Sequence, residues 1–252
     1  MLLWLGFGAL PWVLALSAVG SRASAPRQLR WISRWARVVS RTILDLLRFG
    51  GARYVREGYV ATDVPGIVVM NHQSVLDILT ACVMTGPVVP AFVARARYAR
   101  APIVGTAMGL AGCPVVDPRQ DRDGAVAAMR RAVHMDRALL VYPEGHRTPD
   151  GEVQPFRTAG LRAMLEERRV PVWLVATDGF CAASKVVDFV LHVHRIDGRT
   201  AVLGRYDPPE DVAALDDFLA HLHAELSAGV HRLREARVEA RASRTTARAA
   251  AV

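Results

Sequence analysis

The segment IVVMNHQSVLD (residues 67–77) changes character at Asn71, where an uninterrupted apolar run gives way to polar residues. A short apolar run of this kind is typical of a buried strand, here expected over 66–70, and a helix is expected over 75–84. A strand that turns directly into a helix is the repeating unit of α/β proteins. The segment therefore favours an α/β fold, with its polar residues at the carboxyl end of a strand.

The chain beyond residue 51 continues this alternation of short apolar runs with helical patterns. The expected strands cover 52–57, 66–70, 88–94, 138–142, 171–176, 186–195 and 200–205, and the expected helices cover 75–84, 102–110, 121–135, 157–168 and 210–233. Alternating elements predict a mixed, largely parallel sheet flanked by helices. We expect this α/β domain to span residues 51–237.

The first residues are strongly apolar. The stretch 2–20 contains no charged residue, and its nineteen residues are at the lower limit for a spanning helix. Pro11 would kink such a helix, so insertion into a single leaflet stays open. A cleaved signal peptide is the competing interpretation, supported by the sequence ASA at 23–25. The arginines that follow instead favour a retained anchor, with the next domain in the cytoplasm.

A second N-terminal segment, LRWISRWARVVSRTILDLLRFG (29–50), has helical periodicity. Its apolar stripe comprises Trp31, Trp35, Val38, Val39, Thr42, Leu46 and Phe49, and arginines lie mainly on the other faces. Tryptophan and arginine on an amphipathic helix are typical of a helix in the membrane interface. The alternative is a surface helix packed on the domain. We expect residues 1–50 to form a two-helix membrane-docking segment.

Composition restricts the possible partners. The 252 residues carry a formal net charge of +8, which suits an anionic partner such as a membrane surface or a phosphorylated substrate. No nucleic-acid recognition motif accompanies this charge, so we expect no nucleic-acid partner. Cys82, Cys113 and Cys181 lack metal-ligand spacing and predict packed, reduced thiols. The basic tail over 238–252 is expected to be disordered or a frayed helix.

His72 and Asp77 are the first candidate site residues. If the chain turns from strand to helix near Ser74, the two side chains meet across the first turn. An ionised Asp77 that accepts from one ring nitrogen would leave the other nitrogen as a general base. Ser74 is two residues from His72 and is better placed to cap the helix than to act as a nucleophile.

The segment YPEGHRT (142–148) holds a second candidate cluster after another predicted strand. Its proline and Gly145 predict a tight turn that presents Glu144 and Arg147 together. Arginine matches phosphate with a planar pair of donors, whereas Glu144 would either orient that arginine or bond to nearby backbone. Arg157 opens a further helix, whose N-terminal N–H groups also favour anions. A base and a phosphate site in one cleft indicate a phosphorylated substrate with a hydroxyl group.

Together these motifs resemble the glycerolipid acyltransferase family, which includes bacterial 1-acylglycerol-3-phosphate acyltransferases. The resemblance rests on Asn-His-x4-Asp, the Pro-Glu-Gly-x-Arg turn, PFRTAG (155–160) and VPVWLVA (170–176), in the family's order. It implies an α/β domain behind a membrane-docking hairpin. It also implies that His72 is the general base, that Asp77 orients it, and that the acceptor's own hydroxyl attacks an acyl thioester.

The resemblance further implies that arginines of the second and third conserved blocks bind the acceptor phosphate. The third-block arginine is Arg147, with Glu144 and Gly145 beside it. The second block departs from the family, because GCPVVDPR places Pro118 at the arginine position and Arg119 one residue later. An acceptor other than 1-acylglycerol-3-phosphate, such as lyso-ornithine lipid or another lysophospholipid, therefore stays open.

The expected function is transfer of a fatty acyl group from acyl-CoA or acyl carrier protein to a lysophospholipid, with phosphatidic acid as the product. No metal or redox cofactor is expected, and the expected location is the inner membrane, with the catalytic domain facing the cytoplasm. Two other classes stay open. One is a non-catalytic membrane-surface adaptor, and the other is a metal-dependent phosphohydrolase that uses His72, Asp77, His134, His192 and His194.

Overall fold

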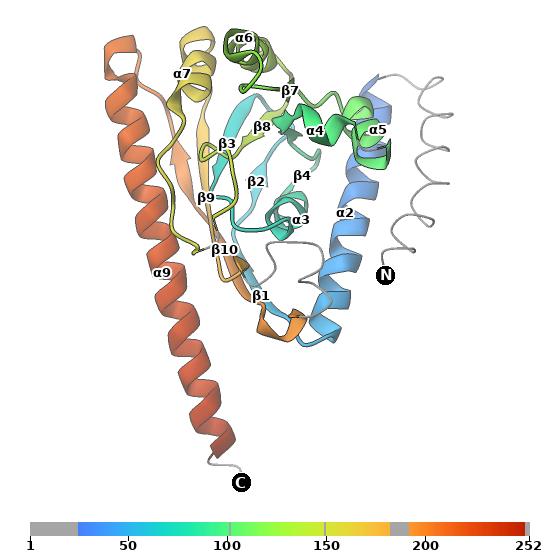
Figure 1. The fold of residues 1–252 in the computed structure, drawn as a ribbon, viewed down its shortest axis with the longest axis vertical. Helices are drawn as coiled ribbons and strands as arrows, with labels where there is room; N and C mark the ends of the chain where they lie inside the picture. The colour runs from blue at the N-terminus through green and yellow to red at the C-terminus, as the bar shows by residue number, and fades with distance from the viewer. Residues whose placement is uncertain (1–24, 101, 149, 182–191, 250–252) are drawn as a thin grey trace.

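A six-stranded sheet forms the centre of the computed structural model, which describes residues 25–100, 102–148, 150–181 and 192–249 (Figure 1). In spatial order its strands are β1 (Arg53–Glu57), β10 (Asp197–Tyr206), β9 (Val172–Asp178), β3 (Gly66–Met70), β8 (Ala138–Val141) and β5 (Ala91–Phe92). β10 runs antiparallel to β9, and the other neighbouring pairs are parallel. The expected mixed, largely parallel sheet is confirmed.

Helices cover both faces of this sheet (Figure 1). One face packs against α6 (Arg122–Ala132), α7 (Thr158–Glu167) and α9 (Leu215–Ala249), and the other against α2 (Ala25–Phe49) and α3 (Leu76–Met84). Successive side chains of a strand point to opposite faces. Ile67 accordingly joins the core beneath α7 and α9, whereas Val68 joins the core beneath α3. Burial on both faces explains why β3 is apolar throughout.

Shorter elements connect the layers. The small strand pairs are β2 (Val60–Ala61) with β4 (Thr85–Gly86), and β6 (Ala94–Arg95) with β7 (Val115–Val116). The other helices among the described residues are α4 (Ala96–Ala99), α5 (Pro102–Leu110) and the 3-10 segments η2 (Val193–Arg195) and η3 (Val212–Ala214).

Most expected elements agree with the structure to within a few residues, but two strands and the last helix, expected over 210–233 and observed as α9, do not. The strand expected over 88–94 is divided between β5 and β6, which belong to different sheets. The strand expected over 186–195 lies partly outside the described residues. Its described end is wrong as a strand, because residues 193–195 form the 3-10 helix η2.

The apolar stripe of α2 faces away from the domain. α2 packs against α3 through the opposite side, whose buried residues are Ile32, Ser33, Ser40, Leu44 and Leu47. Trp31, Val38 and Phe49 are exposed, and their spacing of seven and eleven residues places them along one line of a helix with 3.6 residues per turn. α2 therefore packs on the domain through one side and leaves a row of apolar side chains exposed on its outer side.

Residues 238–249 continue α9 to Ala249, so of the two expected states, disorder or a frayed helix, the structure shows a helix. Figure 1 shows this part of the helix extending beyond the sheet. The helix is held to the domain by ion pairs, because Arg237 Nε lies 2.8 Å from Asp178 Oδ2 and Arg244 lies 2.6 Å from Asp197 Oδ2. The carboxylates come from the ends of β9 and β10, so local sequence does not predict the pairing.

The apolar stretch expected to anchor the chain, residues 2–20, lies outside the described residues. Among the helices that the structure does describe, none combines the length and apolarity needed to cross a bilayer.

Candidate active site

The two polar clusters meet because β3 and β8 are parallel neighbours in the sheet. Their carboxyl ends lie at one edge, where open α/β sheets bind ligands. The segments that follow are joined directly, since the backbone N–H of Thr148 donates to the carbonyl of His72 at 2.9 Å. The structure therefore brings the segment after His72 together with the turn at Pro143–Gly145, as the sequence predicts.

His72 and Asp77 form the expected pair. His72 Nδ1 lies 2.9 Å from Asp77 Oδ2, and the Asp77 side chain is fully buried, whereas that of His72 is 17% exposed. The backbone N–H groups of Gln73 and Ser74 also donate to Asp77 Oδ2, both at 2.7 Å. These donors stabilise an ionised carboxylate. With Nδ1 engaged, Nε2 is the ring nitrogen that can accept a proton.

Ser74 lies at the start of α3. Its Oγ accepts the backbone N–H of Leu76 at 3.2 Å, and the side chain is fully buried. The N-cap position itself is Val75, one residue later than the sequence interpretation placed it, and Ser74 bonds to the first N–H of the helix from the residue before the cap.

Glu144 bonds to backbone rather than to an arginine. Its Oε1 accepts the N–H of His72 at 2.7 Å, and Oε2 accepts the N–H of Gln154 at 2.9 Å. Of the two roles expected for this residue, the structure supports the one that holds the turn. Burial raises the pKa of the Glu144 carboxyl to about 7, although both N–H donors act to lower it.

Tyr142 stacks on the imidazole, a contact that the sequence analysis missed. The two ring centroids are 4.1 Å apart, with 21° between the ring planes. The Tyr142 hydroxyl and Asp77 Oδ1 are both buried without a hydrogen-bond partner within the described part of the chain. Burial, together with the negative charge of Asp77, raises the pKa of Tyr142 well above its usual value. The position of Tyr142 at the end of the strand expected over 138–142 was the available signal.

Arginines gather around the Pro-Glu-Gly turn. Arg95 donates to the carbonyl of Gly145, and a Cβ placed on Gly145 would lie 3.0 Å from Cδ of Arg157. Desolvation lowers the pKa of Arg95, and so do the positive charges of Arg97, Arg119 and Arg157. We call these four residues the arginine cluster. Guanidinium groups that repel one another are stabilised by a bound anion.

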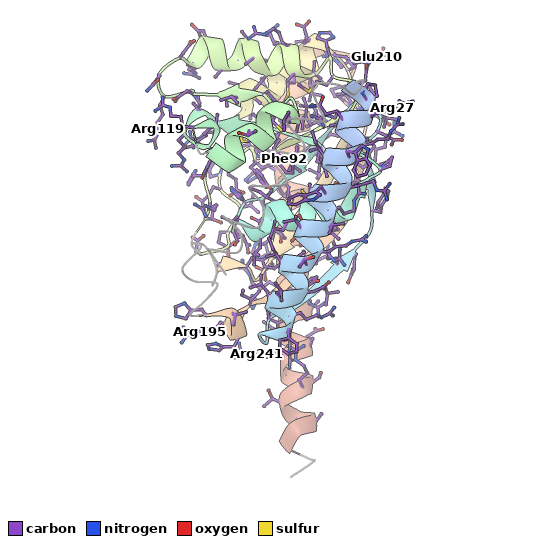
Figure 2. The ribbon with its side chains drawn as sticks, turned by 90° about the vertical axis from the view of Figure 1, so that its right-hand side faces the viewer. Arg27, Phe92, Arg119, Arg195, Glu210 and Arg241 are labelled. Atoms are coloured by element: carbon purple, nitrogen blue, oxygen red, sulfur yellow. The ribbon has the colours of Figure 1, made fainter. Side chains whose placement is uncertain are left out.

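The arginine cluster differs in membership from the sequence prediction. Arg119 and Arg157 belong to it as expected, and Figure 2 shows Arg119 at the outer edge of the molecule. Arg147 is half-buried in the turn, two residues beyond Gly145. Arg95 was missed, although it directly follows the strand expected over 88–94. The same rule that located His72, that ligands bind beyond strand ends, would have identified it.

Two further side chains after β3 hold the edge of the sheet together. Asn71 spans β3 and β9, donating to the carbonyl of Thr177 at 2.9 Å and accepting its N–H at 2.8 Å. Gln73 Nε2 donates to the carbonyl of Gly151 at 3.0 Å, while its Oε1 accepts the N–H of Phe180 at 3.3 Å. Both residues flank His72, so these bonds restrain its backbone from either side.

The histidines considered as metal ligands are not gathered at this site. His134 Nε2 instead lies 3.0 Å from Glu167 Oε1 on the helical face, and His194 belongs to η2. Among the described residues, no group of three or more histidine, cysteine, aspartate or glutamate side chains is placed to hold a metal ion.

Known proteins resemble this chain in sequence and in fold. Residues 48–176, half of the chain, match the model of the protein family described as Acyltransferase. A 1-acyl-sn-glycerol-3-phosphate acyltransferase from Brassica napus is 29% identical over 126 residues, which are 48% of this chain and 36% of that protein. The corresponding alpha enzyme from Ovis aries is 30% identical over 172 residues, which are 62% of this chain and 56% of that protein. The chain therefore spans from about a third to just over half of these relatives.

One solved structure is similar over nearly the whole chain. The 1-acyl-sn-glycerophosphate (LPA) acyltransferase PlsC from Thermotoga maritima superposes with a TM-score of 0.70, covering 92% of this chain and 94% of that one. The sequences are 18% identical, so this similarity shows a shared fold.

Proposed function

The chain belongs to the Acyltransferase family, and from this premise we propose that it transfers a fatty acyl group from acyl-CoA or acyl carrier protein to a lysophospholipid. The proposed acceptor is 1-acylglycerol-3-phosphate, which makes phosphatidic acid the product. The observation that carries the proposal is the His72–Asp77 pair, joined through Glu144 to the turn where the arginine cluster gathers.

The proposed reaction uses His72 Nε2 as a general base. It takes the proton of the acceptor hydroxyl as the hydroxyl oxygen forms a bond to the thioester carbonyl carbon. The carbon–sulfur bond then breaks, and the thiolate leaves with the proton that His72 had accepted. Asp77 stabilises the imidazolium between these steps, and its buried carboxylate already accepts two backbone N–H groups that hold it in place.

The arginine cluster is the proposed site for the acceptor phosphate. Arg95 donates to the carbonyl of Gly145, and the Arg157 side chain lies where a Cβ on Gly145 would point. Gly145 is the neighbour of Glu144, whose carboxylate holds the His72 backbone. A phosphate bound there would lie close to the base, because the residue next to Gly145, Glu144, is hydrogen-bonded to the backbone of His72. Holding the hydroxyl near the base in this way lowers the entropic part of the barrier.

Docking of α2 on a membrane is the proposed route to the lipid substrate. Its exposed stripe of Trp31, Val38 and Phe49 is bordered by arginines one position earlier in the chain, at 30, 37 and 48. Apolar and basic stripes side by side suit an anionic membrane interface. We therefore propose that the protein works at the inner membrane, with the catalytic domain in the cytoplasm.

The test is acyl transfer by purified full-length protein, with the lipid products read by mass spectrometry. Candidate acceptors are lysophosphatidate, lysophosphatidylcholine and lyso-ornithine lipid, each with acyl-CoA and acyl carrier protein donors. We expect turnover with lysophosphatidate and a loss of at least about 100-fold in His72→Ala, as for removal of a general base. The matched control is His134→Ala, on the helical face. Turnover with lyso-ornithine lipid alone would contradict the proposed acceptor, and an unimpaired His72→Ala would contradict the mechanism.

A further inference from the structure

A cavity of about 380 Å³ lies where the end of α2 meets β1 and the end of α3. Tyr54 and Met84 are buried residues of its lining, and Arg48 and Arg56 line it as exposed residues. The cavity is separate from the active site, because Met84 ends the helix that carries Asp77 in its first turn. The two residues are about 10 Å apart along the axis of α3.

Two arginines converge on one aromatic ring in this cavity. The guanidinium carbon of Arg48 lies 5.2 Å from the centroid of Tyr54, and that of Arg56 lies 5.5 Å from it. The Tyr54 hydroxyl donates to Asp45 Oδ1 at 3.3 Å, which holds the ring in place. Within the described residues, neither guanidinium is paired with a carboxylate. Two such groups can both donate to one phosphate.

The surroundings favour an amphiphilic anion over a soluble one. Phe49, next to Arg48, is 96% exposed, and the lining residues Tyr59 and Val55 are 60% and 43% exposed. A soluble anion would leave these side chains in water, whereas the glycerol and acyl carbons of a lipid would cover them. Apolar side chains gathered beside a charged cavity are typical of a ligand site.

The arginine stripe of α2 also leads to this cavity. Arg30, Arg37, Arg41 and Arg48 recur at intervals of seven, four and seven residues, and so lie on one side of the helix. Arg37 lies near the part of the cavity that is lined by Tyr59. A Cβ placed on Gly86 would lie 3.1 Å from an Arg37 nitrogen and 2.6 Å from the Tyr59 hydroxyl.

We propose that this cavity binds the phosphate head group of an anionic membrane phospholipid, apart from the substrate site. Arg48 and Arg56 hold the phosphate, and the acyl chains leave past Phe49 along the apolar stripe of α2. The inference rests on the proposed docking of α2 on a membrane. Because Arg48 belongs to α2 and Arg56 to β1, a bound lipid fixes the orientation of the catalytic domain relative to the bilayer.

The test measures lipid retention by the full-length protein in detergent, by native mass spectrometry. Phosphatidylglycerol is the anionic probe, and phosphatidylcholine, which has no net charge, is the comparison. We expect one retained phosphatidylglycerol, and an affinity at least about 10-fold lower in the double variant Arg48→Gln/Arg56→Gln, which loses two charge-assisted contacts. The matched control is Arg27→Gln/Arg30→Gln, which removes the same number of charges from the opposite end of α2, at exposed positions that do not line the cavity.

Two results would overturn the inference. Equal loss of phosphatidylglycerol in both double variants would mean diffuse attraction to a basic helix. Equally effective competition by glycerophosphoglycerol, the head group without chains, would mean a site for soluble anions. Acyl transfer measured in the same samples separates this inference from the proposed function. A wild type that retains lipid but transfers no acyl group would contradict the function and still support the site.

Discussion

The carboxylate of Glu144 accepts the backbone N–H of His72 at 2.7 Å, across 72 residues of sequence. Its second oxygen accepts the N–H of Gln154 at 2.9 Å, so one buried side chain ties the end of β3 to two parts of the segment after β8. The pairing places the Pro-Glu-Gly turn against the backbone of the proposed base. We regard Glu144 as a positioning residue, because its bonds reach the imidazole only through the main chain.

The first prediction concerns the pH dependence of stability. The raised pKa of Glu144, about 7 against an ordinary 4.5, means that the folded state binds a proton more tightly than the unfolded state. The protonated carboxyl therefore contributes up to about 3 kcal/mol to the free energy of unfolding below pH 4.5. This contribution is lost as the pH rises through 7. Glu144→Gln should lack this loss. Urea unfolding of both proteins between pH 4.5 and 8 checks it, and parallel curves would contradict it.

The second prediction separates the ring of Tyr142 from its hydroxyl. Tyr142→Phe keeps the stack on His72 and removes a buried hydroxyl without a described partner, so we expect stability to rise by about 1 kcal/mol. Tyr142→Leu loses the stack, which is worth roughly 0.5–1.5 kcal/mol, so we expect kcat to fall about 2- to 10-fold. Thermal unfolding and initial rates measure the two effects. A less stable Tyr142→Phe would show that the hydroxyl is satisfied, for example by water.

The third prediction concerns the arginine cluster. Arg95→Ala and Arg157→Ala should each raise KM for lysophosphatidate about 10- to 100-fold, as expected for a lost charge-assisted contact to phosphate. An acceptor without a terminal phosphate monoester should be affected less. Arg205→Ala is the control, because Arg205 pairs with Asp207 at 2.9 Å on the surface. Equal effects on both kinds of acceptor would show that the cluster does not bind phosphate.

The fourth prediction concerns Gly145, whose φ is +72°. An alanine there would occupy the left-handed region and place its Cβ 3.0 Å from Cδ of Arg157. We expect Gly145→Ala to lower stability by about 1–2 kcal/mol and to reduce phosphate binding, because Arg157 must move. Gly109→Ala is the control, since a Cβ there meets nothing within 4 Å and alanine favours the helix. Denaturant unfolding measures both variants, and an unchanged Gly145→Ala would contradict the prediction.

Features of short range in the chain were predictable. The apolar run 67–70 and the polar residues after it predict β3 and the start of α3, and the observed elements agree within one residue. The meeting of His72 with Asp77 also follows locally, because a strand that turns into a helix brings residues five apart across one turn. The sequence did not determine which face of α2 is turned away from the domain. Its apolar stripe was visible in the sequence, but only packing against α3 decided that the stripe faces outward.

The sequence by itself determined the α/β class, the ends of the two strands that carry the polar clusters, and the identity of the proposed base and its partner. These depend on periodicity and on contacts within a few residues, which the order of side chains encodes directly. Only the tertiary structure decided that Arg95 and Arg157 both lie beside Gly145, that Tyr142 stacks on His72 and that Glu144 bonds to main chain. Each of these contacts joins separate strand ends. The order of strands in a sheet is set by packing of the whole domain, which local periodicity does not record.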